Sequence, residues 1–176
     1  MIYLTKIDNL IHIEVGKLSN NNGFICELIN TKIKTMEPKK LCLGLFTGSV
    51  DKLTAAGVVI SGAAAMDMKI DIYVLLQAAR AFKKEVGDDA DKLAMAENPD
   101  LKAEFMQSLK NLNVKTWAEF FREAKSITDV KIHICGLAGK IWGGEKLDDF
   151  VDLADDICGI GAYLTSAEEA DINLFI

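Results

Sequence analysis

The chain has 176 residues, of which 50% are hydrophobic and 26% charged, and its formal net charge is −6. This length suits one domain of ordinary size with a small appendage, and the hydrophobic fraction is enough to fill one core. The acidic balance argues against nucleic acid or an anionic membrane surface as the main partner. The longest apolar runs are far short of the ~20 residues that span a bilayer. Because no signal peptide opens the chain, we expect a cytoplasmic protein without a membrane span.

Cysteine and histidine usage excludes several kinds of site. The four cysteines are widely spaced and form no C-x-x-C motif. A zinc knuckle, a thioredoxin motif and a secreted disulfide framework are therefore poor interpretations. With only two histidines, a His-rich metal site is also disfavoured. We expect no metal and no cofactor.

Residues 1–37 differ in style from the rest of the chain. Two β-rich runs, 2–7 and 10–15, are separated by Asp8-Asn9, which suits a two-residue hairpin turn. A second turn at 20–23 precedes a third β-leaning run over 24–36. We predict a small antiparallel β-meander appendage, which must pack on the main domain or on a neighbouring subunit to be stable.

Residues 38–176 alternate between strand and helix patterns. We expect strands over 41–46, 69–76, 130–135 and 172–176, and helices over 52–68, 78–86, 99–109, 116–126, 147–154 and 163–170. Gly57 and Gly62 in the first of these helices suit close approach to a sheet, and Thr116 precedes Glu119 in capping-box spacing. The alternation predicts an α/β three-layer sandwich around a central, mostly parallel sheet.

Cys135 is the first candidate for chemistry, because it ends the strand over 130–135 and is followed by a loop that contains Gly136 and Gly139. Ligands gather at the carboxyl ends of strands in open parallel sheets. The amides of the segment from Gly136 to Gly139 and the side chain of Lys140 are candidates to favour the thiolate. The alternative is a small hydrophobe at a strand end, since free cysteine is among the most buried residue types.

The other thiols and His133 have plainer interpretations. Cys42 lies inside a strand and Cys26 in the meander, so both are expected to serve in packing. Cys158 is expected in a loop between helices, either as a second thiol near Cys135 or as packing. His133 points to the same side of its strand as Cys135, ~6–7 Å along the chain, which is too far for a direct hydrogen bond. We expect a satisfied core histidine.

The loop Thr47-Gly48-Ser49 feeds a predicted helix and could offer backbone N–H groups to an anion. Neither G-x-x-x-x-G-K-[ST] nor G-x-G-x-x-G is present, so a sulfonate-like oxyanion suits this loop better than a triphosphate. A plain turn is an equal alternative.

The acidic residues near the C-terminus are expected to form a solvated helix face without the other ligands of a metal site; they are Asp148, Asp149, Asp152, Asp155 and Asp156.

Several short motifs carry a family resemblance. They are the runs over 40–48, 63–68, 70–74, 129–135, 159–164, 168–171 and 174–176. From about Lys40 to Ile176 the chain resembles the DsrE/DsrF-like family of sulfur-relay proteins, in particular its DsrE3-type branch. Relatives often have methionines just after the family's cysteine, where this chain has the segment 136–139. The first 36 residues lie outside the resemblance.

The resemblance implies an α/β homo-oligomer that carries sulfane sulfur, as persulfide or thiosulfonate, on a cysteine after a central strand. The matching position is Cys135, and the implied partners are a TusA-like sulfur carrier protein and a small sulfur anion. The first hypothesis is thus a sulfurtransferase-like carrier if Cys135 is reactive, which needs no cofactor. The second is a non-catalytic docking subunit of a sulfur-relay assembly. A third is a small-anion or nucleotide-binding module at the Thr47-Gly48-Ser49 loop.

Overall fold

A computed structural model describes residues 2–7, 10–15, 38–87 and 89–176. The chain divides into two compact units, Met1–Glu37 and Pro38–Ile176. In the first unit, β1 (Ile2–Ile7) pairs antiparallel with β2 (Leu10–Val15), and Ile7 faces Leu10 across the ladder. The expected third β run and Cys26 lie outside the described residues.

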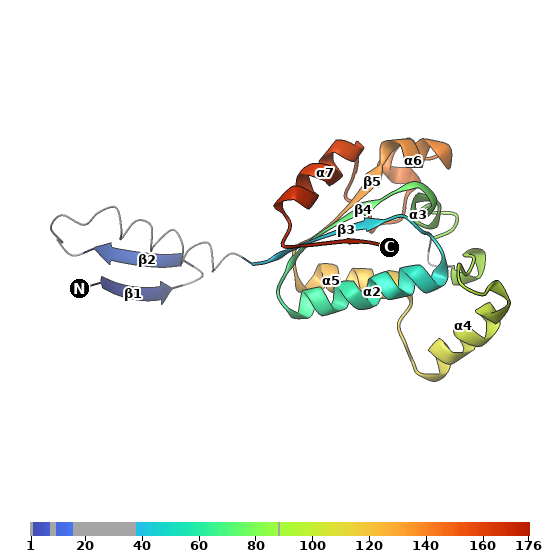
Figure 1. Cartoon of the computed structure of the whole chain (residues 1–176), viewed down its shortest axis with the longest axis horizontal. Coiled ribbons are helices and arrows are strands. Elements are labelled where there is room, and N and C mark those ends of the chain that lie inside the picture. The colour runs from blue at the N-terminus through green and yellow to red at the C-terminus, as the bar shows by residue number, and fades with distance from the viewer. Residues whose placement is uncertain (1, 8–9, 16–37, 88) are drawn as a thin grey trace. The chain divides into compact units, whose positions relative to one another are not determined.

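The second unit is built around a five-stranded sheet in the order β6-β5-β4-β3-β7 (Figure 1). Its strands are β3 (Lys40–Leu45), β4 (Lys69–Val74), β5 (Val130–Cys135), β6 (Asp156–Cys158) and β7 (Ile172–Phe175). Every pairing between them is parallel. The predicted α/β class with a central parallel sheet is confirmed.

Helices cover both faces of this sheet. They are α2 (Val50–Ala65), α3 (Leu76–Ala81), α4 (Lys102–Asn111), α5 (Trp117–Ile127), α6 (Gly136–Ile141) and α7 (Ile160–Glu169), with 3-10 turns η1 (Ala90–Lys92), η2 (Pro99–Leu101) and η3 (Leu147–Asp149). In Figure 1, α2 and α5 lie on one face and α7 on the other. The predicted three layers are therefore present. None of these helices combines the length and apolar character that a membrane crossing requires.

One face of the sheet is uniformly aliphatic, because side chains alternate along each strand and every second position is Leu, Ile or Val. This aliphatic face consists of Leu41, Leu43, Leu45, Ile70, Ile72, Val74, Val130, Ile132 and Ile134, all of them buried. It belongs to one core with side chains of α2 and α5, including Trp117 and Phe121. This core is the main source of stability in the second unit.

Local signals on the covering helices are only partly as predicted. The capping box is present: the Glu119 amide donates to the Thr116 hydroxyl at 3.3 Å, and the Thr116 amide donates to the Glu119 carboxylate at 2.7 Å. Gly57, however, approaches α5 and not the sheet, since a Cβ there would lie 2.8 Å from the Cβ of Phe120. At Gly62 an added Cβ would meet nothing within 4 Å.

Two predicted helices are wrong for a shared reason. The helix expected over 78–86 ends at Ala81, and the one expected over 147–154 is reduced to η3. Lys83 and Phe150 form an isolated antiparallel bridge, and the Val151 amide donates to the Phe82 carbonyl at 2.8 Å. Burying both Phe82 and Phe150 in the core holds these two segments side by side. Long-range pairing thus overrides local helical spacing.

Candidate functional site

The second face of the sheet, under α7, is polar and rich in sulfur. This sulfur-rich face consists of Cys42, Asp71, Tyr73, His133, Cys135 and Cys158. Strand register places neighbours together: Cys42 beside Asp71, Tyr73 beside His133, and Cys135 beside Cys158. Residues from four different strands therefore meet on one surface, which no single segment of the sequence displays.

Cys135 sits at a junction between strand and helix. It is the last residue of β5 and the residue immediately before α6, and its side chain is partly exposed. The loop predicted after it is wrong, because α6 begins at Gly136. Gly139 lets α6 pack closely, since a Cβ there would lie 2.7 Å from the Gly144 carbonyl oxygen. Cys135 is thus a thiol at the carboxyl end of a central strand that solvent can reach.

Cys158 lies in β6, not in the predicted loop between helices, and it is paired in register with Cys135. It is also partly exposed. Burial, together with the charges of Asp156 and Cys135, raises the pKa of the Cys158 thiol to about 11. At neutral pH the Cys158 thiol therefore stays protonated.

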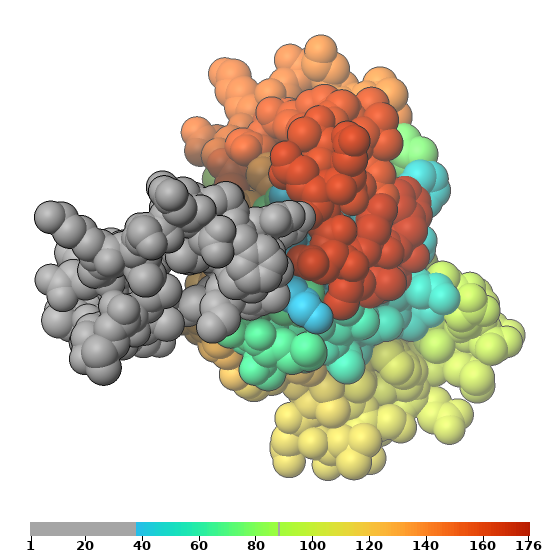
Figure 2. Space-filling view, turned by 60° about the vertical axis from the view of Figure 1, so that its left-hand side comes forward, coloured from blue at the N-terminus to red at the C-terminus, as the bar shows by residue number. Residues whose placement is uncertain are grey.

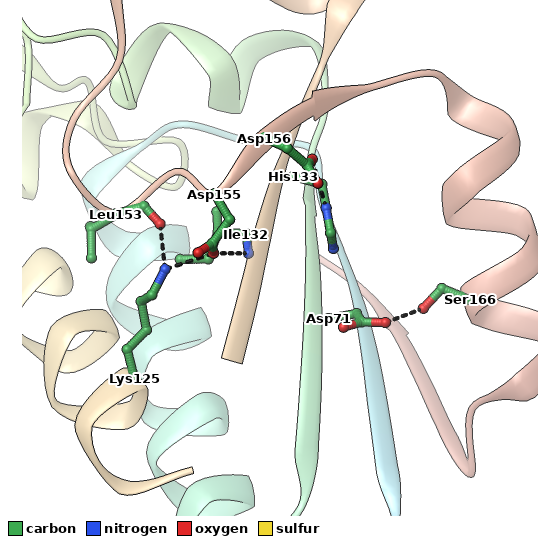
Figure 3. A network of polar contacts seen from close by, with 8 residues as sticks. All are labelled: Asp71, Lys125, Ile132, His133, Leu153, Asp155, Asp156 and Ser166. Atoms are coloured by element: carbon green, nitrogen blue, oxygen red, sulfur yellow. Dashed lines mark hydrogen bonds and ion pairs between the residues drawn. The ribbon is translucent and has the colours of Figure 1, made fainter. Parts of the chain in front are cut away.

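His133 is held by the ring of Tyr73 and by the carboxylate of Asp156, the second of which Figure 3 shows. Its ring stacks on Tyr73 with centroids 4.6 Å apart and planes at 23°. Its Nδ1 lies 2.8 Å from Oδ1 of Asp156 on the neighbouring strand. Among the described residues no hydrogen bond joins His133 to Cys135, in keeping with their predicted separation. The partner Asp156 was not foreseeable, because the strand that carries it has only three residues.

The predicted solvated helix face of aspartates is wrong at Asp155 and Asp156, because neither residue lies on a helix. Burial tends to raise the pKa of the Asp155 carboxyl, but hydrogen bonds from Lys125 and from the Ile132 amide hold it below its ordinary value. The two donors lie 2.6 Å and 2.8 Å from Oδ2 of Asp155 (Figure 3). This contact anchors the start of β6 to β5, which fixes the register of the residues that follow.

A second polar network ties α7 to the sulfur-rich face. The Ser166 hydroxyl donates to Oδ2 of Asp71 at 2.8 Å, and Lys40 Nζ lies 3.0 Å from the same oxygen. Cys42 lies beneath these groups and is fully buried, so its predicted packing role is confirmed. Burial raises the pKa of the Cys42 thiol, which keeps it out of thiolate chemistry.

The Thr47-Gly48-Ser49 loop lines a separate cavity of about 210 Å³ together with Gln77, Arg80, Ala81, Leu93, Ala94 and Ala96. Gly48 is required there, because a Cβ would lie 2.6 Å from the Gln77 carbonyl oxygen. The Arg80 guanidinium carbon lies 5.9 Å from the ring centroid of Trp142. The cavity therefore combines a loop of predicted anion-binding residues with one cation.

The predicted site residues thus fall into separate places. Cys135 and Gly136 end β5 and begin α6, and neither lines the cavity of the Thr47-Gly48-Ser49 loop. Lys140 is exposed on α6, and its side chain makes no hydrogen bond or ion pair with any residue that the structure describes. Sequence reasoning did not connect His133 with Asp156 and Cys158, whose ligand atoms lie within 4.8 Å of one another.

Comparison with known proteins adds a relative but no activity. No protein-family model matches the chain. The chain is 27% identical over 165 residues to the uncharacterized protein YrkE of Bacillus subtilis (strain 168), and the match covers 81% of this chain and 99% of YrkE. Because YrkE is itself uncharacterized, this similarity assigns neither a family nor an activity to the chain.

Proposed function

We propose that the protein carries sulfane sulfur on Cys135 and exchanges it with a partner thiol. The observation that supports this most directly is the position of Cys135: a partly exposed thiol at the carboxyl end of β5, where open parallel sheets present their ligand sites. Cys42 is fully buried, and Cys158 is held protonated by its raised pKa. Of these three thiols, Cys135 is the one whose surroundings suit sulfur exchange.

The exchange itself needs no cofactor. The Cys135 thiolate attacks the outer sulfur of a persulfide donor, which forms a Cys135 persulfide and releases the donor as a thiolate. With thiosulfate as the small sulfur anion, the same attack releases sulfite. In the second step, the thiolate of a partner protein attacks the outer sulfur of the Cys135 persulfide and regenerates the Cys135 thiolate. No electrons are gained or lost overall, since sulfur only changes its carrier.

The resemblance of residues 40–176 to the DsrE/DsrF-like family is the reason to propose a TusA-like carrier as the partner, a homo-oligomeric assembly and a cytoplasmic setting. The cavity of the Thr47-Gly48-Ser49 loop does not include Cys135. We therefore propose that the sulfur anion binds beside the Cys135 thiol, at the end of β5, and not in that cavity.

A second candidate is a docking subunit without chemistry, and exposed apolar side chains favour it. They lie on α6, α7 and β7 and are Leu137, Ile141, Ile160, Leu164, Ile172, Leu174 and Phe175. Figure 2 shows α7 and β7 in red at the surface of one side of the molecule. Exposed apolar side chains in this number suit a protein interaction surface.

The test is intact mass of the reduced protein after incubation with thiosulfate, tetrathionate or a persulfide donor. We expect an adduct of sulfur or thiosulfonate size that reductant removes. Cys135→Ser should lose it, while the matched variants Cys158→Ser and Cys42→Ala should keep it. Absence of an adduct with every donor, together with full biological activity of Cys135→Ser, would establish the docking subunit instead.

A further inference from the structure

We propose that His133, Asp156 and Cys158 form a binding site for a divalent, thiophilic cation of the Zn²⁺ class. Each offers one ligand atom, and these atoms all lie within 4.8 Å of one another. The set combines an imidazole nitrogen, a carboxylate oxygen and a cysteine sulfur, which are the three ligand types that zinc sites use. Among the described residues, no other group of at least three such side chains comes together in this way.

The backbone already positions the three ligands. His133 and Asp156 are register partners on adjacent parallel strands, and Cys158 follows Asp156 by two residues and so points to the same face. Bonds of about 2.0–2.3 Å to a tetrahedral ion place ligand atoms roughly 3.3–3.8 Å apart. The ligand atoms are at most 4.8 Å apart, so side-chain rotations that move them by about 1 Å reach that spacing without moving the strands, and the 2.8 Å contact between His133 Nδ1 and Asp156 Oδ1 opens as the ion enters.

The surroundings of the cluster also suit a cation. The stack on Tyr73 fixes the plane of the His133 ring, as outer-shell contacts commonly do for ligating histidines. The only ion pair recorded for Asp156 within the described part of the chain is with His133, so no lysine or arginine already neutralises this carboxylate. Asp156 is 56% exposed and the side chain of His133 is 16% exposed, which leaves solvent access for the ion.

Three protein ligands leave a fourth position for water or an added ligand, as in zinc sites that are not purely structural. On binding, the Cys158 S–H bond breaks, a sulfur–metal bond forms, and the proton passes to solvent. Cys135 is not one of the three ligands, although it neighbours Cys158. Metal binding and sulfur loading therefore depend on different cysteines, and the proposed site stands without the proposed function.

The experiment uses Co²⁺ as the probe, titrated anaerobically into the reduced full-length chain. We expect one equivalent to bind, with a thiolate-to-cobalt charge-transfer band in the near ultraviolet and visible bands of four-coordinate cobalt, and Zn²⁺ should displace it. Cys158→Ser should abolish the charge-transfer band, while Cys135→Ser and Cys42→Ala should retain it. His133→Phe keeps the ring on Tyr73 and removes both nitrogens, so it should weaken Co²⁺ binding more than tenfold.

Asp156→Asn should likewise weaken binding, and Asp152→Asn is its matched control because that carboxylate pairs with Arg122 elsewhere. Thermal unfolding of each variant separates lost ligands from lost folding. Absence of the band in the wild-type chain, or its survival in Cys158→Ser, overturns the site. If Cys135→Ser loses sulfur loading but retains cobalt, both proposals stand. If Cys135→Ser still loads sulfur, only the proposed function fails.

Discussion

The two faces of the central sheet are built from the same strands but differ in almost every property. The aliphatic face lies under α2 and α5 and is closed to solvent. The sulfur-rich face lies under α7 and carries three thiols, a phenol, an imidazole and a carboxylate, several of them partly exposed. Because side chains alternate between the two faces of a strand, one face can supply the packed core that stabilises the unit while the other carries reactive groups.

The covering helices explain the difference. The 16-residue α2 has eight buried residues. Among the ten described residues of α7 only Ser166 is buried. The aliphatic face therefore receives a well-packed layer, whereas the sulfur-rich face receives a helix held largely by hydrogen bonds and by the rings of Tyr73 and Tyr163.

The sharpest test of this comparison uses neighbours on β3 that point to opposite faces. Leu43→Ala should cost about 2–5 kcal/mol of unfolding free energy, because it empties a fully buried position under α2. Cys42→Ala should cost only about 1 kcal/mol, since it removes one sulfur atom. Urea unfolding of both variants measures the difference. Equal losses would mean that the two faces contribute alike to stability.

Sequence pattern was sufficient for the aliphatic face. Runs such as 41–46 are continuous and apolar, and strands of this type are buried on both sides in parallel sheets. The capping box at Thr116 was equally readable, because all of its partners lie within one turn. The position of Cys135 at the end of β5 followed from the same strand pattern.

The sulfur-rich face could be predicted only in part, because it depends on register between distant strands. β6 has three residues, too few to show a period, so Cys158 was placed in a loop and Asp156 on a helix. The pairing of His133 with Asp156 joins positions 23 residues apart. The helix expected over 147–154 fails for a similar reason, since the bridge between Lys83 and Phe150 is a long-range contact.

The next prediction concerns the two neighbouring thiols of the sulfur-rich face. With a chelator present, iodoacetamide at pH 8 should modify native Cys158 more than ~100-fold more slowly than the same cysteine in unfolded chain, because only the thiolate reacts. A pKa of about 11 leaves almost none of it at that pH. The rate should rise about tenfold per pH unit up to pH 10. Mass spectrometry of tryptic peptides gives the rate at each cysteine.

In the same experiment Cys42 provides the contrast, since it is fully buried and should react only after unfolding. Fast alkylation of Cys158 at pH 7 would contradict the environment described for it.

The attachment of α7 should be weaker than that of α2 and should depend on polar groups. Asp71→Ala leaves the buried Ser166 hydroxyl without its acceptor and leaves Lys40 only its longer ion pair with Glu169, so it should cost about 1–3 kcal/mol. Ser166→Ala should cost about 1 kcal/mol, and the two losses should not add in the double variant. Faster amide exchange confined to α7 would be the accompanying sign. Additive losses would show that the two residues act separately.

The smallest effect is expected from a polar contact at the edge of the aliphatic layer, where Asp51 of α2 accepts the amides of Ala96 and Glu97 at 3.0 and 3.2 Å. Burial tends to raise the pKa of this carboxyl, but those hydrogen bonds outweigh it and hold the pKa below its ordinary value of 3.8. Asp51→Asn should therefore cost about 1 kcal/mol at pH 7. A group with a depressed folded pKa stabilises above its unfolded pKa and loses that contribution as pH falls.

The difference between wild type and Asp51→Asn in urea unfolding should accordingly be full at neutral pH and vanish as pH drops through the folded pKa, below 3.8. Asp148→Asn, which makes the same change at an exposed position, is the matched control and should leave the free energy of unfolding at pH 7 within about 0.5 kcal/mol of wild type. If the Asp51 difference instead persisted in acid, the contact would act through packing and not through charge. The contact at the edge of the aliphatic face would then contribute to stability through packing, as the residues at its centre do.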